Sequence, residues 1–328
     1  MKNILKDLHN HRILEKGEAK DILTNISQGD LNASEIASFL TVFLMRKITI
    51  DELSGFRDSL LDLCIKIDLK EFNPIDLCGT GGDGKNTFNI STLASFITAG
   101  AGVKVAKHGN YGVSSTSGSS NVMEQLGFKF TNDIVKIKQQ IDKANICFLH
   151  APLFHPAMKI VAPIRRELGV KTFFNMLGPM VNPSQPKNQV VGVFSLELLR
   201  LYKYLYQQSD INYSILYSLD GYDEISLTNN TRVVSNIEDS LKTPTNFKSI
   251  ELKQEQLYGG DSVKDSAKIF INILKNNGTA AQNNVVLANA AIAIQTSTQK
   301  SFDESYEMAK ESLESKQAYQ SLKNLFVI

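Results

Sequence analysis

A chain of 328 residues that is 42% hydrophobic and 21% charged can bury a substantial core, and its length predicts one large domain or two unequal ones. The net charge of +1 excludes a general attraction to nucleic acids or membranes, because non-specific polyanion binders carry a strong basic excess. No uncharged run of roughly 18 apolar residues occurs, so we predict no membrane-spanning helix.

The first residues, MKNILKDLHNHRILEKGEAK, are too charged for a signal peptide, which predicts a cytoplasmic protein. Cys64, Cys78 and Cys147 stand far apart and show no CxxC spacing. We therefore expect neither a disulfide framework nor a zinc site, in keeping with a reducing compartment.

Residues 1–70 are predicted to form a small helical domain. An apolar stripe at helical spacing consists of Ile36, Phe39, Leu40, Phe43 and Leu44. Asn32 with Glu35 and Thr49 with Glu52 form capping-box patterns, each ahead of an apolar stripe. The amphipathic helices leave two alternatives open, because they can pack on the rest of the chain or on a second copy of it.

From Pro74 onward, short apolar runs alternate with helical patterns. The runs predicted as strands are PIDLC (74–78), VKVAK (103–107), ICFLH (146–150), VKTFFN (170–175), VVGVFS (190–195) and YSILYSL (213–219). This alternation predicts an α/β domain with a mostly parallel central sheet flanked by helices. Because ligands of such sheets bind beyond the carboxyl ends of the strands, we expect the site residues there.

The stretch CGTGGDGKNTFNIST (78–92) follows the first predicted strand and precedes a predicted helix. Its four glycines can adopt positive φ and leave backbone N–H groups open to an anion. Asn89, Ser91 and Thr92 add donors at the start of the helix. A tight turn before a capped helix is one interpretation, but the glycine and hydroxyl cluster favours a phosphate-binding loop.

The second predicted strand ends in KHGN (107–110), which places an ammonium, an imidazole and an amide at the same edge of the sheet. SSTSGSS (114–120) follows as a hydroxyl-rich loop ahead of another helix, again suited to a phosphate. A flexible surface loop is the alternative for this segment. Two such loops on neighbouring strand–helix units favour a phosphorylated ligand over chance.

Arg165 and Arg166 lie on a predicted helix, where adjacent side chains point about 100° apart, so at most one faces a cleft. A guanidinium is a good bidentate partner for a carboxylate, although a solvated surface charge is the alternative. Pro179, in a Gly-Pro turn predicted to follow a strand, is either a wall for a flat ligand or a simple turn.

Asp223 and Glu224 follow the last predicted strand in the stretch DGYDEIS. Mg²⁺ is commonly held by one or two carboxylates together with substrate phosphates. A solvated turn is the alternative, but phosphate loops on the same edge favour a metal site.

Taken together and in order, these segments resemble one family. GTGGD, N-x-S-T, KHGN, SSxSGS, HPAM with RRELG, FNxLGPxxNP and G-x-DE-x-S are similar to the motifs of anthranilate phosphoribosyltransferases, along nearly the whole chain. The resemblance implies a glycosyltransferase that moves the phosphoribosyl group of 5-phosphoribosyl 1-diphosphate (PRPP) to the amine of anthranilate. The products would be N-(5-phosphoribosyl)anthranilate and diphosphate, in a Mg²⁺-dependent step of tryptophan biosynthesis.

The same resemblance implies a domain arrangement and partners. Residues 1–70, joined by helices within 152–185, would form a small dimerisation domain, and 71–328 would form the catalytic domain. The expected partners are PRPP, anthranilate and a second copy of the chain, with no nucleic acid and no membrane. Association with an amidotransferase is left open.

Site residues follow from the resemblance position by position. The implied PRPP-binding residues are Gly79, Gly82, Asp83, Thr87, Asn89, Ile90, Ser91, Thr92, Lys107, Ser115 and Ser119. The implied anthranilate-binding residues are Gly79, His108, Asn110, Arg165 and Pro179, of which His108, Asn110 and Arg165 would position the reactants. Ser91, Asp223 and Glu224 would hold Mg²⁺. No strong base is evident, so no catalytic residue is assigned, and positioning would supply most of the rate.

Three residues depart from the family pattern. Tyr111 replaces the arginine of KHGNR, Thr116 replaces the lysine of SSKSG, and Asn121 stands where an aspartate is usual. Two cations are therefore missing near an anionic substrate. This leaves open either a lower PRPP affinity or compensation by other cations.

Two other functions compete with this interpretation. Pyrimidine nucleoside phosphorylases share the implied fold and have related loops, but they use inorganic phosphate and lack the FNxLGPxxNP context with its arginine helix. A non-catalytic nucleic-acid-binding paralogue is opposed by the near-neutral net charge and by the acidic pair.

Overall fold

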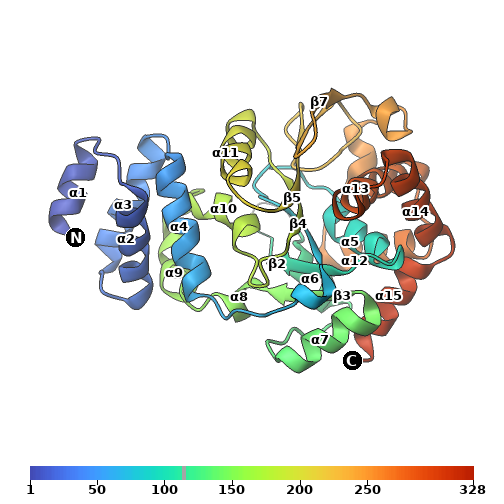
Figure 1. Ribbon diagram of the computed structural model, residues 1–328, viewed down its shortest axis with the longest axis horizontal. Coiled ribbons are helices and arrows are strands. Elements are labelled where there is room, and N and C mark those ends of the chain that lie inside the picture. The colour runs from blue at the N-terminus through green and yellow to red at the C-terminus, as the bar shows by residue number, and fades with distance from the viewer. Residues whose placement is uncertain (113–115) are drawn as a thin grey trace. The chain divides into compact units, whose positions relative to one another are not determined.

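The computed structural model describes residues 1–112 and 116–328, and the chain divides into two compact units (Figure 1). The helical unit combines Met1–Lys66 with Ala151–Pro183. The α/β unit combines Ile67–His150 with Ser184–Ile328. Each unit is therefore assembled from two segments that are far apart in the sequence.

The helical unit takes four helices from its first segment and three short ones, with a 3-10 turn, from its second. They are α1 (Lys2–His9), α2 (Lys16–Gln28), α3 (Ala33–Met45), α4 (Ile50–Leu63), α8 (Ala151–Phe154), α9 (Met158–Leu168), α10 (Phe174–Leu177) and η2 (Gly178–Val181). The predicted caps are confirmed, because Asn32 accepts the Glu35 N–H at 3.0 Å and Thr49 accepts the Glu52 N–H at 3.2 Å.

Aromatic rings fill the core of the helical unit. Phe173 stacks on Phe56 with ring centroids 4.4 Å apart and meets Phe39 and Phe43 edge-on. The prediction of a strand over 170–175 is wrong. This aromatic run is a turn leading into α10, because burying Phe173 among helices satisfies the same apolar residues that suggested a strand.

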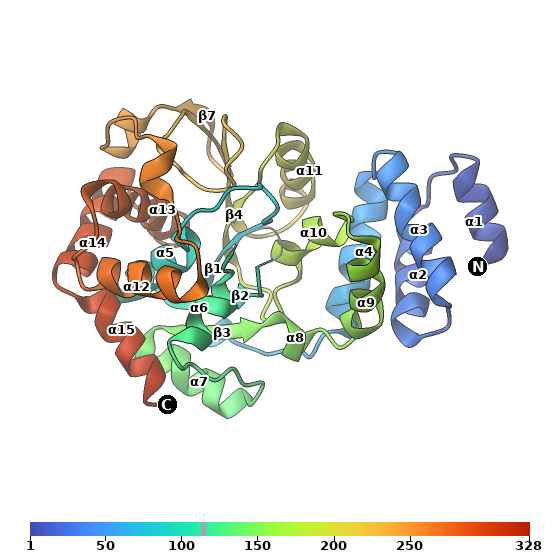
Figure 2. The same ribbon diagram turned by 180° about the vertical axis from the view of Figure 1, so that it is seen from behind.

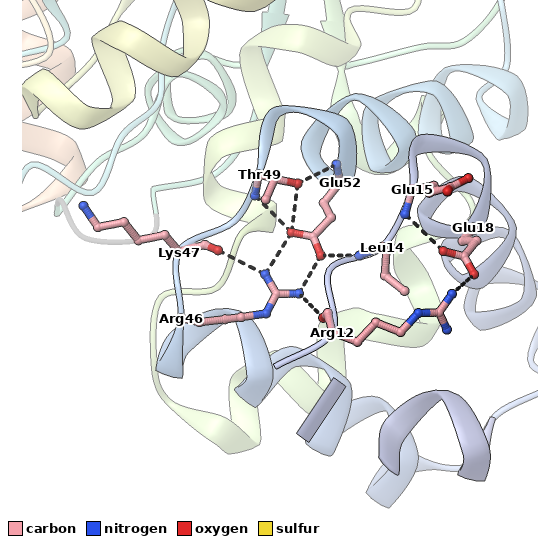
Figure 3. Close-up of polar contacts among 8 residues, drawn as sticks. All are labelled: Arg12, Leu14, Glu15, Glu18, Arg46, Lys47, Thr49 and Glu52. Atoms are coloured by element: carbon pink, nitrogen blue, oxygen red, sulfur yellow. Dashed lines mark hydrogen bonds and ion pairs between the residues drawn. The ribbon is translucent and has the colours of Figure 1, made fainter. Parts of the chain in front are cut away.

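A buried carboxylate ties the loops of the helical unit together (Figure 3). Glu52 is fully buried, and its two oxygens accept hydrogen bonds from the Arg46 guanidinium at 2.5 and 2.9 Å. The N–H groups of Leu14 and Thr49 donate to it as well, each at 3.0 Å. Burial opposes ionisation, but these donors outweigh it and hold the pKa of Glu52 below its usual value. The network joins the loops before α2 and α4.

The α/β unit is built on a seven-stranded sheet, counted over the described residues, in the order β3-β2-β1-β4-β5-β6-β7. The strands are β1 (Ile75–Gly79), β2 (Val105–Gly109), β3 (Ile146–His150), β4 (Asn188–Gly192), β5 (Asn212–Ser218), β6 (Thr231–Ser235) and β7 (Asp239–Lys242). Strands β1 to β5 run parallel, whereas β6 pairs antiparallel with both β5 and β7. The predicted fold class is confirmed, although β6 and β7 were not predicted.

Helices cover both faces of this sheet. They are α5 (Ile90–Gly100), α6 (Ser119–Gln125), α7 (Ile134–Ala144), α11 (Leu196–Gln207), α12 (Val263–Leu274), α13 (Ala280–Thr298), α14 (Phe302–Glu314) and α15 (Gln317–Phe326), with 3-10 turns at Lys70–Phe72, Pro244–Phe247 and Gln254–Leu257. Figures 1 and 2 show α11 on one side of the sheet and α5 and α13 on the other. Helix α13 is buried along nearly all of its length and forms the centre of the core. In the described ranges, none of the helices is long and apolar enough to cross a membrane.

Candidate active site

The candidate site lies at the carboxyl edge of the α/β sheet. Strand β1 pairs with β2 on one side and with β4 on the other, so the strand order reverses beside it. Ligands of open α/β sheets bind at such a reversal. The segments that follow β1, β2 and β5 there are 80–89, the described residues 110–112 and 116–118, and 219–230.

Glycines bring the acidic loop against the end of β1. Gly79 and Gly192 are paired across β1 and β4. A Cβ at Gly79 would meet the Asp223 carboxylate, and a Cβ at Gly192 would overlap the Asp223 carbonyl oxygen. Only glycine at these two positions therefore allows the loop after β5 to come this close.

The loop after β1 is bonded directly to the acidic pair. The Gly81 N–H donates to the Asp223 carboxylate at 2.7 Å, and the Ser91 N–H at the start of α5 donates to Glu224 at 3.1 Å. Gly81 has a φ of +65°, which glycine adopts without strain. The fold thus brings together four of the predicted site residues, which are Gly79, Ser91, Asp223 and Glu224.

The electrostatics of this cluster favour a cation. Burial raises the pKa of Asp223 to about 7, with the charge of Asp83 acting in the same direction. Burial and the charges of Asp223 and Asp83 likewise raise the pKa of Glu224 well above its ordinary value. Each carboxylate accepts a backbone N–H, but those bonds do not offset the repulsion. A bound divalent ion would offset it.

The donor set fits Mg²⁺ bound jointly with a substrate. Among the described residues, no group of three or more His, Cys, Asp or Glu side chains is placed to hold a metal ion by itself. Two neighbouring carboxylates and the hydroxyl of Ser91 are hard oxygen ligands of the kind that Mg²⁺ prefers. Phosphate oxygens of a substrate and water would fill the rest of its coordination shell. These residues therefore fit the ion that the sequence predicted.

Lys107 is the buried cation beneath this edge. Its side chain is 2% exposed, and its ammonium donates to the Leu77 carbonyl at 2.6 Å. Burial lowers the pKa of Lys107, while the charges of Cys78, Asp76 and Glu224 act against that shift. In this structure, the Lys107 ammonium is thus engaged inside the sheet.

The two hydroxyl-rich loops lie side by side. The Asn89 amide donates to the Ser117 carbonyl at 2.9 Å, which links the loop after β1 to the loop after β2. The Ser119 hydroxyl donates to the Asn110 carbonyl at 3.3 Å, and the Ser120 N–H donates to the same oxygen. Ser115, a predicted PRPP contact, lies outside the described residues.

The residues that depart from the family pattern make contacts of their own. The Tyr111 hydroxyl donates to Glu124 at 2.7 Å. The Asn121 side-chain oxygen accepts the N–H groups of Gly112 and Gly118, at 2.9 and 3.0 Å. These bonds hold the ends of the second loop with neutral groups.

Sequence reasoning missed a segment that supports the first loop. Thr87 forms an isolated β-bridge with Tyr258, and the Gly259 N–H donates to the Asn86 carbonyl. A Cβ at Gly259 would clash with the Thr87 backbone. The glycine pair 259–260 was the available signal, since adjacent glycines often mark a close approach of two backbones.

The remaining predicted PRPP contacts lie in or beside the first loop. Gly82 has a φ of +80°, and Asp83 accepts the Lys85 N–H at 3.1 Å. Ile90 and Thr92 are buried in the first turn of α5. They therefore shape the start of the helix with their backbone more than with exposed side chains.

His108 near the end of β2 and Asn110 directly after it differ in their surroundings. His108 is buried, and its backbone N–H donates to the buried carboxylate of Asp76 at 3.1 Å. Asn110 is exposed, and its side-chain oxygen accepts the Tyr111 N–H. Asp76, which sequence reasoning did not select, fixes the backbone at the end of β2.

Arg165 and Pro179 belong to the helical unit, whereas the other described site residues belong to the α/β unit. The Arg165 guanidinium donates to the Asn175 side chain at 3.2 Å and lies over the Phe174 ring. Pro179 is buried in η2 and follows α10, so the prediction of a turn directly after a strand is wrong.

Comparisons with known proteins agree with these features. Residues 71–319 match the family model described as glycosyl transferase family, a/b domain, and residues 2–64 match its helical bundle domain. The chain is 63% identical to the anthranilate phosphoribosyltransferase of Flavobacterium psychrophilum, over 99% of this chain and 98% of that protein. The chain belongs to the anthranilate phosphoribosyltransferase family.

Solved structures of anthranilate phosphoribosyltransferases share this fold. The Thermus thermophilus enzyme aligns with a TM-score of 0.92 at 30% identity, covering 98% of each chain. The Saccharomyces cerevisiae enzyme in complex with PRPP and Mg aligns with a TM-score of 0.88 at 28% identity, covering 96% of this chain and 93% of that one. The family resemblance is thereby confirmed, and the protein is a glycosyltransferase.

Proposed function

We propose that this protein transfers the phosphoribosyl group of PRPP to the amine of anthranilate, with Mg²⁺ bound at Asp223, Glu224 and Ser91. The observation that carries the proposal is the pairing of these two carboxylates with the Gly81 and Ser91 N–H groups at the carboxyl edge of the sheet. The Saccharomyces cerevisiae relative has been solved in complex with PRPP and Mg, which supports the choice of ligands.

The loop after β1 suits the diphosphate of PRPP. Its positive-φ glycines and the start of α5 gather backbone N–H groups, of which those of Gly81 and Ser91 bond to the acidic pair in this structure. The amino end of a helix also favours an anion. Such fixed donors stabilise the negative charge that develops as the bond between C1 and the diphosphate breaks. Mg²⁺, when bound, would neutralise further charge on that leaving group.

The amine of anthranilate is already nucleophilic, so no covalent intermediate on the protein is required. His108, Asn110 and Arg165 would orient the aromatic substrate, and Arg165 is suited to its carboxylate because a guanidinium matches a carboxylate bidentately. No side chain is assigned as a base. Holding the two substrates in line would then supply most of the rate.

The proposal also includes further ligand-binding residues and a second copy of the chain. The other residues implied for PRPP and anthranilate, Lys107, Ser115, Ser119 and Pro179 among them, stay predictions. A homodimer formed through the helical unit is also part of the proposal, because the family resemblance implies it.

The test is direct. Protein, PRPP, Mg²⁺ and anthranilate are mixed, and the loss of anthranilate fluorescence is followed; the chain has no tryptophan to add background. Turnover that needs all four components and is strongly weakened, but still measurable, in Arg165→Ala supports the proposal. No turnover, or phosphorolysis of thymidine without PRPP, would overturn it in favour of another activity.

A further inference from the structure

The Arg165 guanidinium is held on two sides within the helical unit. Its Nη2 donates to the Asn175 Oδ1 at 3.2 Å, and its central carbon lies 5.2 Å from the centroid of the Phe174 ring. Phe174 is 5% exposed, so the ring that supports the cation is itself fixed by packing. The plane of the guanidinium is therefore constrained before any ligand arrives.

One buried donor of this guanidinium has no partner in the described ranges. The Nε–H of Arg165 is buried and has no hydrogen-bond partner among the residues that the structure describes. A buried donor without a partner is costly, so it marks a position where an acceptor from a ligand would be favoured. Burial also lowers the pKa of Arg165, but a guanidinium titrates too high to lose its charge at neutral pH.

Asn175 is itself fixed. Its Oδ1 accepts the Thr172 N–H at 3.1 Å, which anchors the side chain to the turn before α10. Phe173, between these two residues, is locked into the aromatic core by its stacking on Phe56. The acceptor that faces Arg165 thus sits on a rigid part of the helical unit.

The neutrality of this acceptor matters. An amide oxygen can hold one N–H of the guanidinium and leave its positive charge uncompensated. A carboxylate in the same place would form an ion pair and compete with an incoming anion. No acidic side chain is paired with Arg165 in the described part of the chain.

We propose that Asn175, with Phe174 beneath the cation, is a positioning residue that presents Arg165 to the carboxylate of an aromatic acceptor of the ortho-aminobenzoate type. This inference rests on the proposed function. It assigns to Asn175 the task of fixing the guanidinium while preserving its charge.

Two variants at this position separate positioning from folding. Asn175→Ala removes the hold on Arg165 and also the bond to Thr172. Asn175→Asp retains an acceptor for the Arg165 guanidinium and for the Thr172 N–H, so the turn is preserved. Its carboxylate, however, forms an ion pair that compensates the positive charge of Arg165. We expect both to raise the KM for anthranilate by about 10- to 100-fold, with the KM for PRPP unchanged. Asn25→Ala, at an exposed asparagine of α2, is the matched control and should behave like the parent.

The outcomes divide cleanly. Asn175→Asp with the parent's anthranilate KM would overturn the inference, as would an equal loss for both substrates. In an Arg165→Ala background, Asn175→Ala should add no further rise in the anthranilate KM, because it acts through Arg165. An additional, multiplicative rise there would also overturn it. If the parent itself shows no turnover, the proposed function fails, whereas a parent that turns over with insensitive Asn175 variants refutes this inference alone.

Discussion

Glu52 is fully buried and Glu224 is partly buried, and their surroundings shift their pKa values in opposite directions. Glu52, in the helical unit, accepts five hydrogen bonds, two of them from the Arg46 guanidinium (Figure 3). Glu224, in the α/β unit, accepts one backbone N–H and is repelled by Asp223 and Asp83. The protein supplies Glu52 with enough hydrogen-bond donors to balance its negative charge. It does not do so for Glu224, whose charge would be balanced by a bound cation.

This contrast distinguishes the structural charge of Glu52 from the charge of Glu224, for which a metal-binding role is proposed. A carboxylate surrounded by donors stabilises the fold and has no capacity left for a ligand. A carboxylate beside other carboxylates destabilises the empty fold and is retained where a cation is bound. The direction of the pKa shift therefore distinguishes the two roles better than burial alone.

The largest expected effect is on the structural side. Glu52→Ala leaves the Arg46 guanidinium and two backbone N–H groups without their shared acceptor, and should lower the free energy of unfolding by about 3–5 kcal/mol. Urea denaturation followed by circular dichroism measures it. Glu71→Gln, which removes the exposed ion pair with Lys138, is the control and should leave stability nearly unchanged. A loss no larger than the control's would break the comparison.

The next effect is on the functional side. Gly192→Ala would push the Asp223 backbone away from β4, and should lower kcat/KM about 100-fold through misplacement of the acidic pair. Gly17→Ala, at a position with open space around it, should leave the kinetics unchanged. Steady-state rates with PRPP and anthranilate test both. Equal rates for the two variants would mean that the close approach of Asp223 is not needed.

A pH experiment extends the comparison to a buried base. Burial lowers the pKa of His155, in the helical unit, to about 4. The unfolded chain therefore binds a proton near pH 6.5 that the folded chain refuses until about pH 4, so stability falls as the pH drops through this window. His155→Gln should flatten the decline between pH 7 and pH 5 by about 2 kcal/mol. Parallel stability curves for parent and variant would contradict this.

The smallest expected change in stability has the opposite sign. Glu224→Gln removes repulsion at the acidic pair, and should stabilise the metal-free protein by about 1 kcal/mol while abolishing turnover. Thermal unfolding in EDTA and in rising Mg²⁺ tests this, since the parent should gain more from Mg²⁺ than the variant does. A metal-free variant less stable than the parent would mean that Glu224 is as well satisfied as Glu52.

Much of the α/β unit was predictable, because the relevant signals are local. Each strand of β1 to β5 overlaps an apolar run of the sequence, and the glycine loop and the acidic pair directly follow strands. Once the strands are parallel, their carboxyl ends must meet at one edge. Residues as distant as Gly79 and Asp223 could therefore be assigned to the same site from sequence alone.

What could not be predicted depends on tertiary contacts. The run 170–175 has the aromatic and β-branched composition of a strand, and only its packing among Phe39, Phe43 and Phe56 makes it a turn before a helix. Strands β6 and β7 are short and carry polar residues, so they lacked an apolar signal. Asn175 resembles any turn asparagine until the position of Arg165 is known.

The bond between Gly81 and Asp223 also has a consequence for how the protein is made. It joins residues 142 positions apart, and Asn86 bonds to Gly260 across 174. A growing chain on the ribosome must therefore expose more than two thirds of its length before the candidate site can form. Nascent fragments that end earlier should be unable to capture substrate, which confines ligand-assisted folding to the last stage of synthesis.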